Sequence, residues 1–210
     1  MRIEKTAPPR ARRRAARLRP AERRAQLVAS ALAVFARVGL GSARHADVAV
    51  AARVSLPAVF HYFPTRATLV KAVLDAIERF YLDMMIDAVT ATRGAPARDT
   101  LLAHGRAFAR SVDTHPAHAR VWLDWSTAVG GQLWRRYLHL SRRVDRGVTA
   151  TVRRGKGDGS VAADVIPEDA ARLFVAAAYA VVQMKLAGQG DGKVERFLGS
   201  AVRAVVGRAS

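Results

Sequence analysis

The chain has 210 residues, half of them hydrophobic, and a formal net charge of +18. A chain of this length can bury a real hydrophobic core, so length and composition argue against a disordered protein. It contains no cysteine, which excludes disulfides, thiolate metal sites and cysteine nucleophiles and fits a reducing compartment.

The positive charge is concentrated near the N-terminus. Residues 1–24 carry ten basic side chains against two acidic ones, a net +8, and residues 25–70 add four arginines against Asp47, a net +3. The first third of the chain therefore holds +11 of the +18, which predicts a polyanionic partner. The alternative is that arginine and alanine are common throughout the chain and that a charged tail only aids solubility.

Neither a signal peptide nor a membrane span is expected. The basic N-terminus is followed by an amphipathic segment and not by a continuous apolar one. The longest apolar run, residues 173–184, is far below the roughly 20 residues that cross a bilayer. We therefore expect a soluble, cytoplasmic protein without membrane contact, associated with the nucleoid when bound to DNA.

Apolar residues recur at helical spacing between clusters of glycine and proline, and no segment alternates convincingly as a strand would. The chain is therefore predicted to be all-α. Residues 1–19 are expected to form a disordered basic arm, because they offer little to pack. The predicted helices, separated by short loops that include the glycine-rich stretch 155–160, cover residues 20–38, 44–52, 55–63, 65–92, 97–113, 116–129, 131–154, 167–187 and 192–206.

Residues 20–65 are predicted to form an N-terminal domain of three helices. Pro20 suits the first turn of a helix, and the apolar stripe of that helix stops before Gly39. The next two helices are short and separated by a three-residue turn, which is the spacing of a helix-turn-helix, with Ser55 as a candidate N-cap. Residues 66–210 are predicted to form a larger C-terminal helical domain for ligand binding and dimerisation.

The helix over 55–63 is expected to read DNA, because a helix fits the major groove. His61 can hydrogen-bond a purine acceptor or a phosphate, Ala58 can contact a thymine methyl, and Pro57 is exposed beside them. The apolar side chains expected to lock this helix against the rest of the domain are Val59, Phe60 and Phe63.

Phosphate contacts are expected around this helix and from the arm. Ser55, at the helix N-terminus, can bond a phosphate that the helix dipole also favours. The other candidates near the helix are Arg44, Tyr62 and Thr65. The arm arginines suited to a flanking minor groove, whose negative potential attracts arginine, are Arg12, Arg13, Arg14 and Arg17. The alternative is that the two short helices are only a packing unit.

A long stretch resembles the DNA-binding domain of TetR-family regulators: VFARVGLGSARHADVAVAARVSLPAVFHYFPTRATLV. Two further segments, VWLDWSTAVGGQLW and PEDAARLF, resemble the LuxR/HapR branch, the quorum-sensing master regulators of vibrios. The resemblance spans about residues 15–205.

The resemblance implies an omega-like all-helical protomer, a homodimer and a pseudo-palindromic operator. It implies a transcriptional repressor that in this branch also activates, and a minor-groove contact by Arg17. His61 stands where the branch has asparagine, and Pro57 and Ala58 stand where it has Ala-Thr. The operator sequence is therefore not carried over.

The C-terminal domain holds most of the remaining aromatic and soft apolar side chains, which suit a cavity for a small apolar or amphipathic effector. The resemblance places the pocket of the branch at Trp122, Leu138, Ser141 and the helix around 174–178, with Ser141 in place of an asparagine. The residues expected to line a ligand pocket are Phe80, Tyr81, Met84, Met85, Trp122, Trp125, Leu138, Ser141, Phe174 and Ala178. The alternative for each of them is an ordinary place in the core.

The dimer interface is expected on the last two helices. Alanines in the run 173–184 permit a close helix contact, and the resemblance predicts a four-helix interface that includes residues 192–206. The residues expected in this interface are Ala176, Ala177, Ala180, Met184, Phe197 and Val202. Ligand occupancy is expected to move the helix over 65–92 and so to change the separation of two DNA-reading heads.

No catalytic residue, cofactor or metal site is expected. His115 and His118 have the spacing of a metal-binding pair, but no third ligand is close in sequence, and the stretch 155–160 lacks the spacing of a Walker motif. Asp124 has no partnered base or nucleophile and is interpreted as a polar or salt-bridged helix position. Two alternatives stay open: a non-specific, arm-driven nucleic-acid binder, and a helical enzyme acting on an apolar substrate near Trp122.

Overall fold

The structure, a computed structural model, describes residues 18–207. The four arm arginines predicted to contact DNA, and the predicted disorder of the arm, lie outside this range apart from residues 18 and 19. Over the described range the chain forms nine α-helices and no strand, which confirms the all-α prediction. The helices are α1 (Pro20–Val38), α2 (His45–Ala52), α3 (Leu56–Tyr62), α4 (Arg66–Ala91), α5 (Ala97–Thr114), α6 (Pro116–Thr127), α7 (Gly131–Gly157), α8 (Pro167–Leu186) and α9 (Asp191–Val206).

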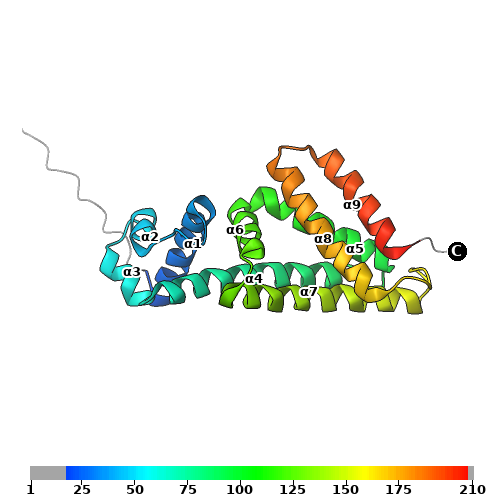
Figure 1. Cartoon of the computed structure of the whole chain (residues 1–210), viewed down its shortest axis with the longest axis horizontal. Helices are drawn as coiled ribbons and strands as arrows, with labels where there is room; N and C mark the ends of the chain where they lie inside the picture. The colour runs from blue at the N-terminus through cyan, green and yellow to red at the C-terminus, as the bar shows by residue number, and fades with distance from the viewer. Residues whose placement is uncertain (1–17, 208–210) are drawn as a thin grey trace, which may run out of the picture.

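The molecule is elongated, with α1, α2 and α3 packed together at one end (Figure 1). The long helix α4 leaves this unit and runs beside α7 along the length of the molecule, while α5, α8 and α9 gather at the other end. Helix α6 stands between the two ends and packs against α1. Helices α4 and α6 are therefore the two elements that connect the N-terminal unit to the rest of the chain.

Local capping explains why the helices begin where the sequence predicts. Pro20 occupies the first turn of α1, and the Glu22 carboxylate accepts a hydrogen bond from the Arg19 backbone N–H at 2.8 Å. Thr65 and Thr68 cap α4 reciprocally: the Thr68 N–H donates to Thr65 Oγ1 at 3.2 Å, and the Thr65 N–H donates to Thr68 Oγ1 at 3.1 Å. These bonds satisfy backbone donors that a helix start leaves without an intrahelical partner.

The predicted loop over 155–160 begins too early, because α7 continues to Gly157. Gly155 is buried, and a Cβ atom there would lie 2.5 Å from both Ala97 Cβ and Val161 Cγ2. The glycine therefore serves close packing inside the helix, not chain reversal. A sequence pattern that takes clustered glycines as a helix stop misses this use.

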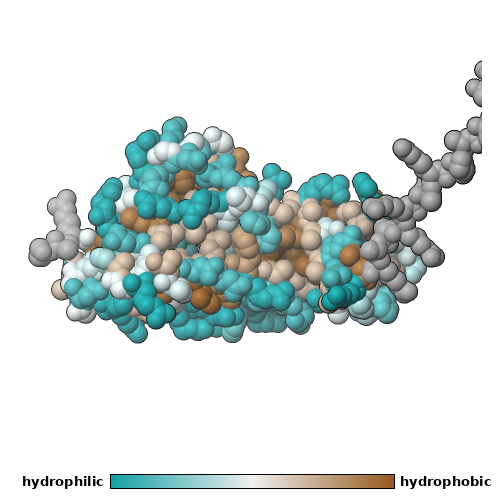
Figure 2. Space-filling model, turned by 180° about the vertical axis from the view of Figure 1, so that it is seen from behind, coloured by the Kyte–Doolittle hydropathy of each residue, from teal (hydrophilic) through white to brown (hydrophobic). Residues whose placement is uncertain are grey.

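The hydrophobic core runs through the whole length of the molecule. A first cluster of buried residues joins Phe35 of α1 to Ile77 of α4 and Trp125 of α6, and a second cluster around Leu101 and Val152 fills the far end. The core thus continues across the predicted domain boundary. Seen from behind, apolar residues gather over the middle of the molecule, whereas the lower edge and the tip of the α8–α9 hairpin are mostly hydrophilic (Figure 2).

Within residues 18–207, no helix is both long and apolar enough to cross a membrane. The same part of the chain holds no cluster of three or more His, Cys, Asp or Glu side chains that could bind a metal ion. His115 and His118 do lie together, with ring centroids 5.4 Å apart.

Candidate DNA interface and ligand cavity

The turn between α2 and α3 depends on a left-handed backbone conformation at Arg53. Arg53 ends α2 with a φ of 55°, the only positive φ at a residue other than glycine in the described range. The Val54 N–H then donates to the Ala49 carbonyl at 3.0 Å, which closes the turn. Two short helices joined in this way form a helix-turn-helix.

Helix α3 is held in place by buried side chains on one face. Val59 and Phe63 are almost fully buried in the first core cluster, as predicted. His45 at the start of α2 is also buried, and its Nε2 atom lies 2.8 Å from the Phe63 carbonyl oxygen. This hydrogen bond ties the beginning of α2 to the end of α3. The sequence analysis missed His45, although its spacing of three from the buried Val48 places it on the inward face of α2.

The prediction that Phe60 faces inward is wrong. Its side chain is 45% exposed, and its ring stacks on the His45 ring with centroids 4.4 Å apart and planes 10° apart. Phe60 therefore covers His45 from outside and does not anchor α3 in the core. An aromatic residue in a short helix satisfies its hydrophobic surface in either way, and spacing alone does not separate the two.

The opposite side of α3 faces solvent. Pro57 and His61 are exposed, while Ala58 and Tyr62 are half-buried. Ser55 is exposed as well, but its hydroxyl makes no capping hydrogen bond, so the prediction that its side chain caps α3 is wrong. The consequence is a short helix whose reading face carries small side chains and one imidazole.

Two further expected phosphate contacts lie at neighbouring helix starts. Arg44 is exposed and precedes α2, where its backbone N–H donates to the Asp47 carboxylate at 2.9 Å. Thr65 is exposed and precedes α4. Residues 18–65 carry six arginines against Glu22 and Asp47, a net +4, so this end of the molecule is positively charged even without the arm.

The turn between α1 and α2, residues 39–44, is held from two sides; we refer to it as the junction loop. The Arg66 guanidinium, at the start of α4, donates to the carbonyls of Leu40, Gly41 and Ala43. From α6, Asp124 Oδ2 accepts a hydrogen bond from the Leu40 backbone N–H at 2.6 Å. The interpretation of Asp124 as a polar helix position is refined by this bond, which joins α6 to the N-terminal unit.

A cavity of about 70 Å³ lies among α4, α5, α6, α7, α8 and α9. Its walls are Tyr81, His104, Gly105, Phe108, Trp122, Tyr137, Leu140, Ser141, Val144, Phe174, Val175, Ala177, Ala178, Val181, Leu198, Ala201 and Val202. Five of the ten expected pocket residues are among them: Tyr81, Trp122, Ser141, Phe174 and Ala178. The five that do not line it are Phe80, Met84, Met85, Trp125 and Leu138.

These five residues have other packing partners. Phe80 lies against the His115 and His118 rings, at centroid distances of 4.8 and 4.4 Å. Trp125 is fully buried, and its Nε1 atom donates to the Leu133 carbonyl at 2.8 Å. Met85 packs on α7 at Gly147, whose absent side chain makes room for the sulfur. The remaining two, half-buried against the first core cluster, are Met84 and Leu138.

Two polar groups of the cavity wall were not recognised from the sequence as a pair. His104 lines the cavity, and burial lowers the pKa of its imidazole to about 4. Tyr81 is 6% exposed, and its hydroxyl is the one buried side-chain polar atom in the described range without a hydrogen-bond partner. Burial also raises the pKa of this hydroxyl. By contrast, the hydroxyls of Tyr137 and Tyr179 are bonded to each other.

The expected dimer residues are divided between surface and interior. Ala176 is exposed, and the half-buried members of the set are Ala177, Ala180, Met184 and Phe197. Val202 is fully buried inside the protomer and lines the cavity, so its side chain is not available to a partner. Ala177 also lines the cavity. Leu173 of α8 was not expected in the interface but is 57% exposed.

Comparison with known proteins supports the same fold and site. Residues 27–73 match the family of bacterial regulatory proteins described as the tetR family. The chain is 32% identical over 171 residues to the HTH-type transcriptional regulator LuxR of Vibrio harveyi, covering 81% of this chain and 82% of that protein. That the chain is not an enzyme fits these relatives and stays a prediction.

Solved structures of regulators share the fold at low sequence identity. A TetR-like transcriptional regulator from Rhodococcus sp. RHA1 superimposes with a TM-score of 0.74 at 19% identity, covering 91% of this chain and all of that one. The regulator FadR from Bacillus subtilis, solved with stearoyl-CoA, gives a TM-score of 0.71 at 14% identity, covering 87% of this chain and 97% of that one. With the identity to LuxR and the helix-turn-helix at its N-terminal end, this chain belongs to the TetR family of transcriptional regulators.

Proposed function

We propose that the protein is a homodimeric, sequence-specific regulator that places α3 in the major groove of a two-fold symmetric operator. The observation that carries this proposal is the division of α3 into two faces. Val59 and Phe63 fix the helix from inside, and Pro57 and His61 are left exposed on the side that would meet base edges. Arg44 and Ser55 lie at helix starts beside this face, where they would meet phosphates.

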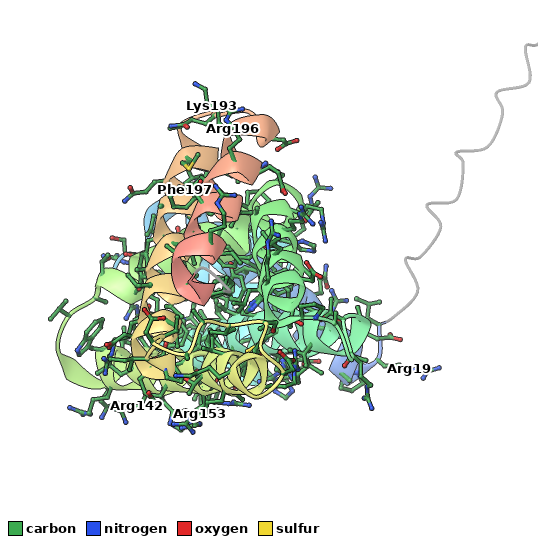
Figure 3. The ribbon with its side chains drawn as sticks, turned by 90° about the vertical axis from the view of Figure 1, so that its right-hand side faces the viewer. Arg19, Arg142, Arg153, Lys193, Arg196 and Phe197 are labelled. Atoms are coloured by element: carbon green, nitrogen blue, oxygen red, sulfur yellow. The ribbon has the colours of Figure 1, made fainter. Side chains whose placement is uncertain are left out.

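The second copy would join through α8 and α9, which form a hairpin at the end of the molecule away from α3 (Figure 1). Leu173 and Ala176 expose apolar surface on α8, and Phe197 on α9 is half-buried. Figure 3 shows Phe197 on the side of the molecule opposite Arg142 and Arg153 of α7. The proposed interface thus lies away from this charged edge, as an apolar self-contact requires.

Ligand control would pass through the junction loop. Helix α4 carries Tyr81 in the cavity wall and Arg66 at the junction loop, while α6 carries Trp122 in the same wall and Asp124 at the same loop. A ligand that shifts α4 against α6 would therefore act on one loop of the DNA-binding unit from both sides. The spacing of two α3 helices in a dimer is sensitive to such a shift.

Selection of bound DNA from random oligonucleotides tests this proposal. We expect an enriched inverted repeat with half-sites about one helical turn or a small multiple of it apart. On the selected site, His61→Ala should reduce discrimination by about 1 to 3 kcal/mol, whereas Arg44→Ala should weaken binding to all sequences and reduce the salt dependence. Ile86→Ala, on the exposed surface of α4, is the matched control and should change neither.

Equal loss on all sequences for the His61 and Arg44 variants would favour the arm-driven, non-specific binder. Failure to enrich any symmetric sequence would overturn the proposal itself.

A further inference from the structure

The cavity wall carries no formal charge. Among the described residues that line it there is no Asp, Glu, Lys or Arg. The titratable group nearest neutrality is His104, and because burial lowers its pKa to about 4 the imidazole is uncharged at pH 7. An ionised ligand would lose its hydration on entering without gaining an opposite charge, which is a large cost. The wall therefore selects against carboxylates and phosphates.

The Tyr81 hydroxyl is the polar group of this wall that lacks a partner. It is buried, and the neighbouring Ser111 hydroxyl, which donates to the Phe108 carbonyl at 2.6 Å, does not meet hydrogen-bond geometry with it. A buried hydroxyl without a partner is unfavourable, so a ligand that supplies one gains the bond and removes the penalty. This single group indicates where the polar end of a ligand would lie.

The rest of the wall is aromatic and aliphatic. Tyr81, Phe108 and Trp122 form a triangle of rings, with centroids 5.5, 6.3 and 5.7 Å apart, and Phe174 and Tyr137 also contribute to the lining. Rings packed at these distances favour a further ring in an edge-to-face or offset arrangement.

The volume limits the size of the ligand. The cavity measures about 70 Å³, whereas a protein cavity that takes up benzene measures about 150 Å³. One small ring is therefore the most that the walls take without large rearrangement, and a long acyl chain is excluded.

We propose that this cavity binds a compact, uncharged, single-ring aromatic molecule whose one polar substituent hydrogen-bonds to the Tyr81 hydroxyl. The inference rests on the ligand cavity of the proposed function and adds the charge, size and polar contact of the effector. It concerns binding to the protein alone and is separate from DNA recognition.

Calorimetric titration of the purified protein with four probes at pH 7 tests the proposal. Phenol and toluene have the same number of heavy atoms and differ in the hydroxyl; benzamide and benzoate have the same shape and differ in charge. We expect phenol to bind about threefold to tenfold more tightly than toluene, the usual value of one hydrogen bond. We expect benzamide to bind at least about a hundredfold more tightly than benzoate, because the carboxylate would be buried without a partner.

The variant Tyr81→Phe isolates the polar contact. Because it removes a hydroxyl that has no partner in the fold, it should unfold at the same temperature as the wild type or higher. It should bind phenol and toluene equally. The matched control is Tyr179→Phe, which removes a hydroxyl bonded to Tyr137 that is not part of the cavity wall, and which should keep the preference for phenol.

Three results would overturn the inference: no binding of any probe, equal affinity for benzamide and benzoate, or a preference for phenol that persists in Tyr81→Phe. The proposed function is judged separately, by operator selection. A protein that binds these probes as stated but enriches no DNA sequence would leave the inference standing and refute the proposed function.

Discussion

The Asp124 carboxylate accepts a hydrogen bond from the Leu40 backbone N–H at 2.6 Å, across 84 positions of the sequence. This bond joins α6, which lines the cavity through Trp122, to the loop that connects α1 and α2. On the other side of the same loop, Arg66 binds the carbonyls of Leu40, Gly41 and Ala43. The backbone of one loop is therefore fixed by the two helices that also enclose the cavity.

Removal of this bond should uncouple the two ends of the molecule. We expect Asp124→Ala to lower the free energy of unfolding by about 1 kcal/mol, the usual value of one partly exposed hydrogen bond, as measured by urea unfolding. Operator affinity should change little, but its response to a bound effector should shrink. Asp124→Asn, which keeps an acceptor oxygen, should lie between the two. An unchanged effector response in Asp124→Ala would show that the signal takes another route.

Replacement of Arg53 by glycine should stabilise the protein. Arg53 has a left-handed backbone with a φ of 55°, which costs a residue with a Cβ atom roughly 1 kcal/mol and costs glycine almost nothing. We expect Arg53→Gly to raise the free energy of unfolding by about 0.5 to 1 kcal/mol, while Arg53→Ala should not raise it. Chemical denaturation of both variants separates the backbone effect from loss of the charge. A stability no higher than that of the alanine variant would contradict this reading of the turn.

Two glycines in α7 should respond to alanine in opposite ways. At Gly155 a Cβ atom would meet Ala97 Cβ and Val161 Cγ2 at 2.5 Å, so Gly155→Ala should destabilise the protein by about 1 to 3 kcal/mol through overpacking. At Gly157 no atom lies within 4 Å of the added Cβ, and Gly157→Ala should be neutral or slightly stabilising. Thermal unfolding of the pair measures the difference. Equal effects would mean that α7 does not approach Ala97 this closely.

Stability should fall as the pH is lowered from about 6.5 to 4. Burial lowers the pKa of His104 from 6.5 to about 4, so the unfolded chain takes up the proton first. The free energy of unfolding from this group is fully present above pH 6.5 and is lost as the pH falls toward 4. The loss is about 2 kcal/mol after allowance for partial exposure.

Urea unfolding of the wild type and His104→Leu at several pH values checks this slope. The variant stays uncharged at every pH and should lose most of the dependence. Part of the remaining slope should come from His118, whose pKa is also lowered by burial and by the neighbouring His115. An identical slope in both proteins would show that His104 is not buried as described.

Most of the fold could be predicted from the sequence because local signals mark the helix ends. Pro20, the Thr65 cap and Pro116 act within one turn of the chain, so they show in the sequence as they do in the structure. Gly155 was misread because a glycine that serves close packing looks the same in a sequence as one that ends a helix.

The site was harder to predict because it depends on long-range neighbours. Trp122 and Trp125 share a helix, yet Trp122 lines the cavity and Trp125 donates to the Leu133 carbonyl outside it. His104 and Tyr81 meet only because α4 and α5 pack together. Composition showed that aromatic groups were available, but not which of them face the cavity. For the same reason Val202 was expected at a surface and is buried.

The central claim, that α3 enters duplex DNA as one of two symmetric copies, can be tested by directed cleavage. Because the chain has no cysteine, Ala51→Cys on the exposed surface of α2 gives a single attachment point for iron–EDTA. On the selected operator the tethered iron should cut at two clusters related by a two-fold axis and centred about one helical turn, or a multiple of it, apart. The same tether on Ile86→Cys, exposed in the far half of α4, should not cut. Diffuse cleavage along the duplex, or one unpaired cluster, would contradict the account.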